Sequence, residues 1–102
     1  MTRVARGSIF SGANHFHVLT DGLPGLDVFR EPNMKNFYLV TVEEKAKDTG
    51  VSVLAYCVMQ NHSHLIVTSD DVQNISEFMR RVNTTYAKFY NRIKGRRKRI
   101  RF

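Results

Sequence analysis

The sequence predicts a single α+β domain in which strands and helices follow one another in the order β-α-β-β-α-β. Three features predict it: three runs rich in β-branched and aromatic residues, two stretches with apolar residues at helical spacing, and turn-forming residues between them. With 102 residues, of which 42% are hydrophobic, the chain fits one small domain spanning residues 1–102.

The first half of the chain predicts one strand and one helix. Residues 14–20, with the sequence NHFHVLT, favour a strand, and the Asp21-Gly22 pair that follows is a turn signal. Residues 33–48 place apolar side chains at steps of three and four, which predicts a helix. Gly50 stands where a left-handed residue would end that helix.

The second half predicts two strands, a helix and a last strand. Residues 51–59 and 62–68 are β-rich runs whose short connection favours an antiparallel pair. In the following helix we expect Asn74 to cap the N-terminus and Glu77 to reach back to it. Its apolar face consists of Ile75, Phe78, Met79, Val82, Tyr86, Phe89, Tyr90 and Ile93.

After Gly95, alternating side chains predict a short edge strand within residues 97–102. The complete order is the split βαβ pattern of ferredoxin-like domains, with a four-stranded antiparallel sheet and two helices on one face.

The net charge of +7 is concentrated in a basic tail, residues 92–102. All nine acidic side chains precede this tail, and basic side chains balance them there. Concentrated positive charge attracts polyanions because neutralised phosphates release counterions, so the tail predicts a nucleic-acid partner. A solvated, disordered tail is the alternative. The tail residues that we expect to contact DNA are Arg92, Arg96, Arg97 and Arg99.

A second basic stripe is predicted on the polar side of the last helix. Arg81, Lys88 and Arg92 recur there with Thr84 and Thr85 at steps of three and four. Such a stripe could bind a phosphate backbone, and a plain solvated helix face explains it as well.

The sequence also suggests where the protein acts. It contains no apolar run of the roughly 18 residues that a membrane span requires, and MTRVARGSIF lacks the apolar centre of a secretion signal. We therefore expect a soluble, cytoplasmic protein without a membrane partner. The single cysteine, Cys57, lies in the apolar run VSVLAYCVM, where we expect it to be a buried core residue.

All four histidines occur in two His-x-His pairs, His15 with His17 and His62 with His64. Residues two apart on a strand project from the same face, so each pair directs two imidazoles to one region. Neutral imidazole nitrogens are common ligands of divalent metals, although a strand histidine more often bonds a backbone carbonyl. In the ferredoxin-like order the first and third strands are neighbours, so both pairs could face a shared site.

The second pair lies within a longer motif. Residues 54–67 read LAYCVMQNHSHLIV, which resembles the signature AYC-hydrophobe-MPNHxHL of the single-tyrosine HUH transposases associated with insertion sequences and repetitive extragenic palindromes. Residues 16–18 (FHV) and 28–30 (VFR) are similar to the family's first strand and its entry to the first helix. Residues 78–92 are similar to its second helix, so the resemblance covers nearly the whole chain.

The resemblance implies that His62 and His64 bind Mg²⁺ or Mn²⁺, of which Mn²⁺ suits imidazole better. It implies DNA transposition, in which a tyrosine cleaves single-stranded or hairpin DNA and remains joined to the 5′ end until the strands are rejoined. We expect His17 to support the site or the bound DNA.

The sequence departs from the family's pattern at Gln60, where a proline is usual, and at Ser63, where a bulky apolar residue is usual. Family members also carry the nucleophilic tyrosine on a third helix, which we expect to lie beyond Phe102, so the catalytic residue is unknown here and the chain looks truncated. None of Tyr38, Tyr56, Tyr86 and Tyr90 is a convincing substitute, because Tyr38, Tyr86 and Tyr90 belong to apolar helix faces and Tyr56 to a strand.

Two alternative functions stay open. One is a noncatalytic single-stranded nucleic-acid-binding module, whose sheet would stack bases on aromatic residues such as Phe16. The other is a metal-dependent nuclease that uses water as its nucleophile. A homodimer is also expected, since a sheet without its last helix would leave one face exposed.

Overall fold

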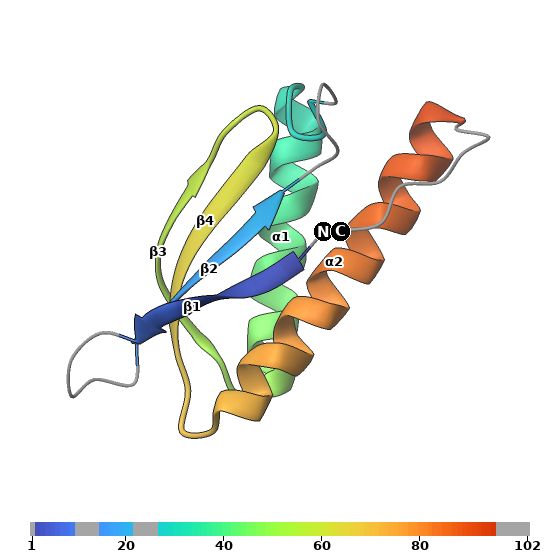
Figure 1. Cartoon of the computed structure of the whole chain (residues 1–102). Helices are drawn as coiled ribbons and strands as arrows, with labels where there is room; N and C mark the ends of the chain where they lie inside the picture. Colours follow the sequence, from blue (N-terminus) through green and yellow to red (C-terminus); the bar gives the residue numbers. More distant parts are fainter. Residues whose placement is uncertain (1, 10–14, 22–26, 96–102) are drawn as a thin grey trace.

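The computed structural model describes residues 2–9, 15–21 and 27–95, and the side chains of 15–21 and 27–95 (Figure 1). In chain order the elements are β1 (Thr2–Ile9), β2 (His15–Asp21), α1 (Pro32–Thr49), β3 (Ser52–Val58), β4 (His62–Thr68) and α2 (Val72–Lys94).

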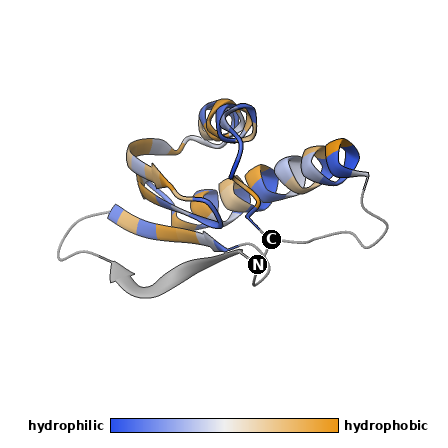
Figure 2. Ribbon diagram, turned by 90° about the horizontal axis from the view of Figure 1, so that it is seen from above, coloured by the Kyte–Doolittle hydropathy of each residue, from blue (hydrophilic) through white to orange (hydrophobic). Residues whose placement is uncertain are grey.

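The sheet is antiparallel, and β4 lies between β2 and β3. β1 pairs with the other side of β2. Both helices lie against the same face of the sheet, and the view from above shows no helix among the described residues on its opposite face (Figure 2). We call that opposite side the open face.

The structure confirms the α+β class, the two helices and the antiparallel sheet. It also confirms that the first and third predicted strands are neighbours, since β2 pairs with β4 along its whole length. β1 is not among the strands predicted from the sequence. β1 is the strand that lies at the edge beside β2. The edge strand predicted within residues 97–102 lies outside the described residues, so the exact ferredoxin-like order stays a prediction.

The alternation of side chains along β2 and β4 separates the core from the open face. Phe16, Val18, Leu65 and Val67 are buried beneath the helices, while their sequence neighbours on these strands are only partly covered. Successive side chains of a strand point to opposite faces, so burying one set directs the other set to the open face.

The two helices begin and end with recognisable signals. Pro32 stands in the first turn of α1, where its missing N–H costs nothing, and Gly50 ends the helix with φ of 72°. Gly95 ends α2 in the same left-handed conformation, with φ of 59°. Only glycine adopts this backbone geometry without a steric cost.

The predicted cap of α2 is wrong. The helix begins about one turn earlier than expected, because the Asp71 carboxylate accepts a hydrogen bond from the Gln73 backbone N–H and acts as the N-cap. Asn74 instead donates to the Ser69 hydroxyl, and Glu77 forms ion pairs with Arg80 and Arg81. Glu77 therefore does not complete the predicted cap.

A buried polar cluster lies in the core directly beneath His62 and His64. The Tyr38 hydroxyl of α1 is 2.6 Å from the Ser63 hydroxyl of β4 and also bonds Thr20, which is the residue opposite Ser63 on β2. Thr20 donates a longer bond of 3.5 Å to the Asn83 side-chain oxygen of α2. Burial raises the pKa of Tyr38, although the bonds to Ser63 and Thr20 act in the opposite direction.

This cluster predicts an energetic coupling between Ser63 and Tyr38. Ser63→Ala and Tyr38→Phe should each lower the free energy of unfolding by about 1–2 kcal/mol, since each leaves a buried hydroxyl without its partner. The double variant should lose about 1 kcal/mol less than the two single losses together. Urea unfolding of the four proteins measures this coupling.

The control is Ser52→Ala, which removes a hydroxyl from an exposed residue of β3. It should change stability by less than about 0.5 kcal/mol. Strictly additive losses for Ser63 and Tyr38 would show that the two hydroxyls do not stabilise one another.

Candidate functional site

Three histidine side chains gather on the open face of the sheet. His17 comes from β2, and His62 and His64 come from β4. They reach this face because their neighbours Ser63 and Leu65 are fully buried on the other. The histidine pairs predicted from the sequence therefore share one face.

The rings of these histidines are in contact. His17 Nε2 lies 2.8 Å from His64 Nδ1, and their ring centroids are 5.0 Å apart with the rings tilted by 33°. His62 and His64 also have centroids 5.0 Å apart, with nearly perpendicular rings. His62 Nδ1 lies 2.7 Å from the side-chain oxygen of Asn61. We call His17, His62 and His64 the histidine cluster.

His15 does not join the cluster by any contact seen among the described residues. It pairs with Thr68 at one end of β4, whereas His64 pairs with Leu19 further along β2. The idea that both His-x-His pairs face one site is thus supported for His17 and not for His15.

The cluster favours a neutral His64. Partial burial lowers the pKa of His64, and the nearby charges of His17 and His62 lower it further, while Asp21 has the opposite effect. Asp21 stands opposite His62 in the β2–β4 register. A neutral imidazole keeps a nitrogen lone pair, which is the form that binds a metal.

The cluster alone is not a complete metal site. Within the described parts of the chain, no group of three or more His, Cys, Asp or Glu side chains is arranged to hold a metal ion. His62 and His64 can offer two nitrogen ligands, and any further ligand would have to come from water, from a substrate or from other residues.

Cys57 is exposed, so its predicted place in the core is wrong. It lies on β3 and pairs in register with His64, which puts it on the open face. The register of β3 shifts between Val53 and Ala55, and this irregularity changes which residues face the core. Residues 53–59 (VLAYCVM) are all hydrophobic, so they carry no alternation from which the exposed side could be predicted.

Phe16 is buried in the core beneath the helices, with 8% of its surface exposed. It therefore cannot stack bases on the open face. Phe16, the aromatic residue named as an example for the base-stacking alternative, is therefore not available for that role.

The basic stripe of α2 and the histidine cluster lie on opposite sides of the sheet. Arg81, Lys88 and Arg92 belong to α2, which lies against the face of the sheet opposite the open face, so the structure does not bring them to the histidines (Figure 1). Hydrogen bonds from Arg80 and Arg81 lower the pKa of Glu77 to about 2, and part of the positive charge is neutralised there.

Lys88 is exposed, and the guanidinium of Arg92 lies 5.9 Å from the ring centre of Phe89. The predicted tail contacts Arg96, Arg97 and Arg99 lie outside the described residues.

None of the four tyrosines lies in the histidine cluster. Tyr38, Tyr86 and Tyr90 are buried on the helix side of the sheet, as the sequence predicts. The Tyr86 hydroxyl donates to the Val28 carbonyl, and burial raises the pKa of Tyr86. Tyr56 is exposed, but it pairs with the buried Leu65 and so lies on the helix side at the sheet edge.

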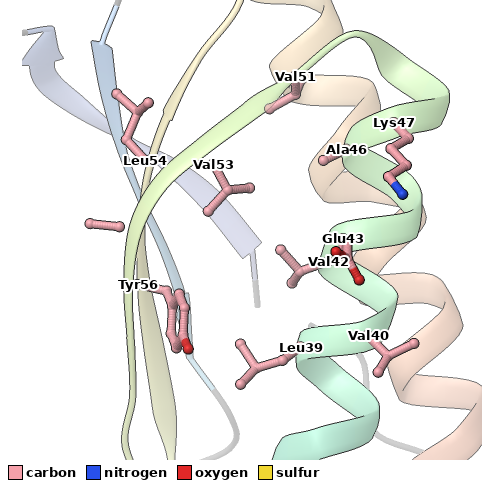
Figure 3. Close-up of a pocket in the computed structure, with 11 residues that line it drawn as sticks. Leu39, Val40, Val42, Glu43, Ala46, Lys47, Val51, Val53, Leu54 and Tyr56 are labelled. Atoms are coloured by element: carbon pink, nitrogen blue, oxygen red, sulfur yellow. The ribbon is translucent and has the colours of Figure 1, made fainter.

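An apolar groove of about 700 Å³ lies between α1 and β3, away from the histidine cluster (Figure 3). Leu39 and Val42 of α1 face Val53 and Tyr56 of β3 across it. Val40, Leu54 and Tyr56 are each more than half exposed here. The groove holds no histidine.

Comparison with protein families identifies one match. The model of a family described as "Transposase IS200 like" matches residues 26–101, well over half of the chain. The comparison with curated proteins gives no match. In the part of the chain that the structure describes, neither helix is both long and apolar enough to cross a membrane.

Proposed function

Since the chain belongs to the IS200-like transposase family, we propose that it binds single-stranded or hairpin DNA on the open face, for metal-dependent cleavage and rejoining in transposition. The observation that carries this proposal is the histidine cluster on a sheet face that no described helix covers. A bound strand could reach the imidazoles there without displacing any described element.

His62 and His64 fit a divalent cation as two nitrogen ligands. The Asn61 side-chain oxygen can only accept a hydrogen bond, so His62 donates through Nδ1 and keeps a lone pair on Nε2. When bound, Mg²⁺ or Mn²⁺ would polarise the scissile phosphate and neutralise charge on its oxygens. Mn²⁺ is the better match for imidazole.

The covalent step requires a tyrosine oxygen that attacks phosphorus, forms a phosphotyrosine at the 5′ end and releases a 3′ hydroxyl. Rejoining is the reverse of this step, so no outside energy source is needed. The resemblance to the family assigns this tyrosine to a helix after α2, and none of the four tyrosines described above supports that role.

The tyrosine positions favour a second candidate, a noncatalytic module that binds single-stranded DNA. Such a module would use the histidine cluster or the basic residues Arg81, Lys88 and Arg92 without cleaving the strand. A DNA partner also favours a cytoplasmic location for either function.

For the oligomeric state we propose a homodimer that closes the groove between α1 and β3. Glu43 and Lys47 both line this groove beside its apolar side chains. A twofold axis would bring Glu43 of one copy to Lys47 of the other while covering Val40, Leu54 and Tyr56.

DNA bound on the open face should cover Cys57. Cys57 is the only cysteine, and it is exposed opposite His64, so it reports on the open face. Saturating hairpin DNA should slow maleimide modification of Cys57 in proportion to the fraction bound. The matched control carries Cys57→Ser and Thr84→Cys, which moves the thiol to an exposed position on the basic stripe.

Protection at position 84 but not at position 57 would assign the DNA to α2 and contradict binding on the open face. The two variants are compared by mass spectrometry of the modified protein at equal DNA saturation.

Loss of His62 and His64 should weaken metal binding. His62→Ala combined with His64→Ala should lower Mn²⁺ affinity by at least about tenfold, measured by calorimetry, because both proposed ligands are lost. His15→Ala, on the same face but outside the cluster, should bind Mn²⁺ like the unmodified protein. Unchanged Mn²⁺ binding by the double variant would show that the site is assigned to the wrong residues.

The same proteins distinguish the functions when incubated with Mn²⁺ and a labelled hairpin oligonucleotide. A covalent adduct on a denaturing gel supports the phosphotyrosine mechanism. Free cleaved product supports a nuclease that uses water, and retention without cleavage supports the binding module.

A charge placed in the groove between α1 and β3 should disrupt the proposed dimer. Tyr56→Lys should shift the protein from dimer to monomer in light scattering coupled to size-exclusion chromatography, because it places a charge in the apolar interface. Val72→Lys changes another exposed hydrophobic residue, which lies outside the groove, and should leave the dimer intact. A monomeric unmodified protein at about 100 μM, where weak dimers form, contradicts the proposed interface.

A further inference from the structure

The hydrogen bond between His17 and His64 can have two forms with opposite consequences. Two neutral imidazole nitrogens 2.8 Å apart share one proton, so one ring donates and the other accepts. If His17 donates, His64 carries its own proton on Nε2 and that nitrogen cannot bind a cation. If His64 donates through Nδ1, its Nε2 keeps a free lone pair.

The sheet register sets the reach of this bond. Leu19 is the direct partner of His64 across the β2–β4 pair, and His17 is two residues away on the same face. Such diagonal neighbours are within reach of long or aromatic side chains. Within this reach, Nε2 of His17 lies against Nδ1 of His64, so the nitrogen of His64 that stays available is Nε2.

His62, the other proposed ligand, already donates through Nδ1 and keeps its Nε2 lone pair free. Asn61 accepts from Nδ1 of His62, which leaves the Nε2 lone pair of His62 free. A metal-binding histidine normally donates its other N–H to an acceptor that fixes its tautomer and orientation. Asn61 supplies that acceptor for His62, and on β2 the matching position for His64 is occupied by His17.

We propose that His17 is a positioning residue: its Nε2 accepts the Nδ1 proton of His64 and so keeps the Nε2 lone pair of His64 free for the divalent cation. This inference rests on the proposed metal site. It assigns His17 to orienting a ligand, with no direct contact to the cation or the scissile phosphate.

The test reads the proton position directly. Two-bond ¹H–¹⁵N correlation spectra of the metal-free full chain, labelled with ¹⁵N-histidine, report which ring nitrogen carries hydrogen. We expect His64 to be protonated at Nδ1 in the unmodified protein and to shift toward Nε2 protonation in His17→Phe, where the acceptor is missing.

Metal binding supplies the second readout. His17→Phe should weaken Mn²⁺ binding by about tenfold in calorimetry, the effect typical of losing the partner of a ligand. His17→Gln, whose amide oxygen can accept the same bond, should restore most of the affinity. His15→Phe is the matched control on the same strand face and should bind like the unmodified protein.

The outcomes separate this inference from the proposed function. Nε2 protonation of His64 in the unmodified protein, or unchanged Mn²⁺ affinity in His17→Phe, overturns the role of His17. If one of these results is found and His62→Ala still loses Mn²⁺ binding, only the role of His17 is wrong and the proposed metal site stands. If the unmodified protein binds no Mn²⁺, the metal site fails and with it the role of His17.

Discussion

The positions of His62 and His64 depend on which side of β4 packs against the helices. Ser63 is fully buried and bonds Tyr38 of α1, so the residues on either side of it, His62 and His64, must point the other way. A slip of one residue in this strand would place both imidazoles in the core and Ser63 on the surface. The buried hydroxyl pair and the apolar neighbours Leu65 and Val67 oppose that slip together.

The same hydroxyl pair explains how the chain accommodates its departure from the family's pattern. A bulky apolar residue between the two histidines would fill the core by itself, whereas a serine leaves space and an unsatisfied hydroxyl. The buried Tyr38 of α1 bonds the Ser63 hydroxyl, while Thr20 adds a second bond to Tyr38. A buried polar group costs little once its hydrogen bonds are made. The departure at Ser63 is therefore compensated from α1 and β2.

The regular elements could be predicted closely because their signals are local. Residues 14–20, 33–48 and 62–68 match β2, α1 and β4 within one residue at each end, since alternation and helical spacing are visible in the sequence. The cap of α2 was wrong because two acceptable caps, Asp71 and Asn74, lie within one turn. The prediction for Cys57 was wrong because residues 53–59 (VLAYCVM) are hydrophobic without a break, so only the tertiary structure shows which side of β3 is exposed.

The site could be predicted in part for a related reason. Period two was enough to place His62 and His64 together, but the contact between His17 and His64 depends on the register between strands far apart in the sequence. The sequence also could not show that the basic stripe of α2 lies on the opposite side of the sheet from the histidines. Helical spacing shows which residues share a helix face, but not where that face lies in the molecule.

Positive charge on α2 and imidazoles on the open face could contact one DNA strand only if the strand passed around the sheet edge. A short single strand lying on the open face would thus meet the histidine cluster and not the cations of α2.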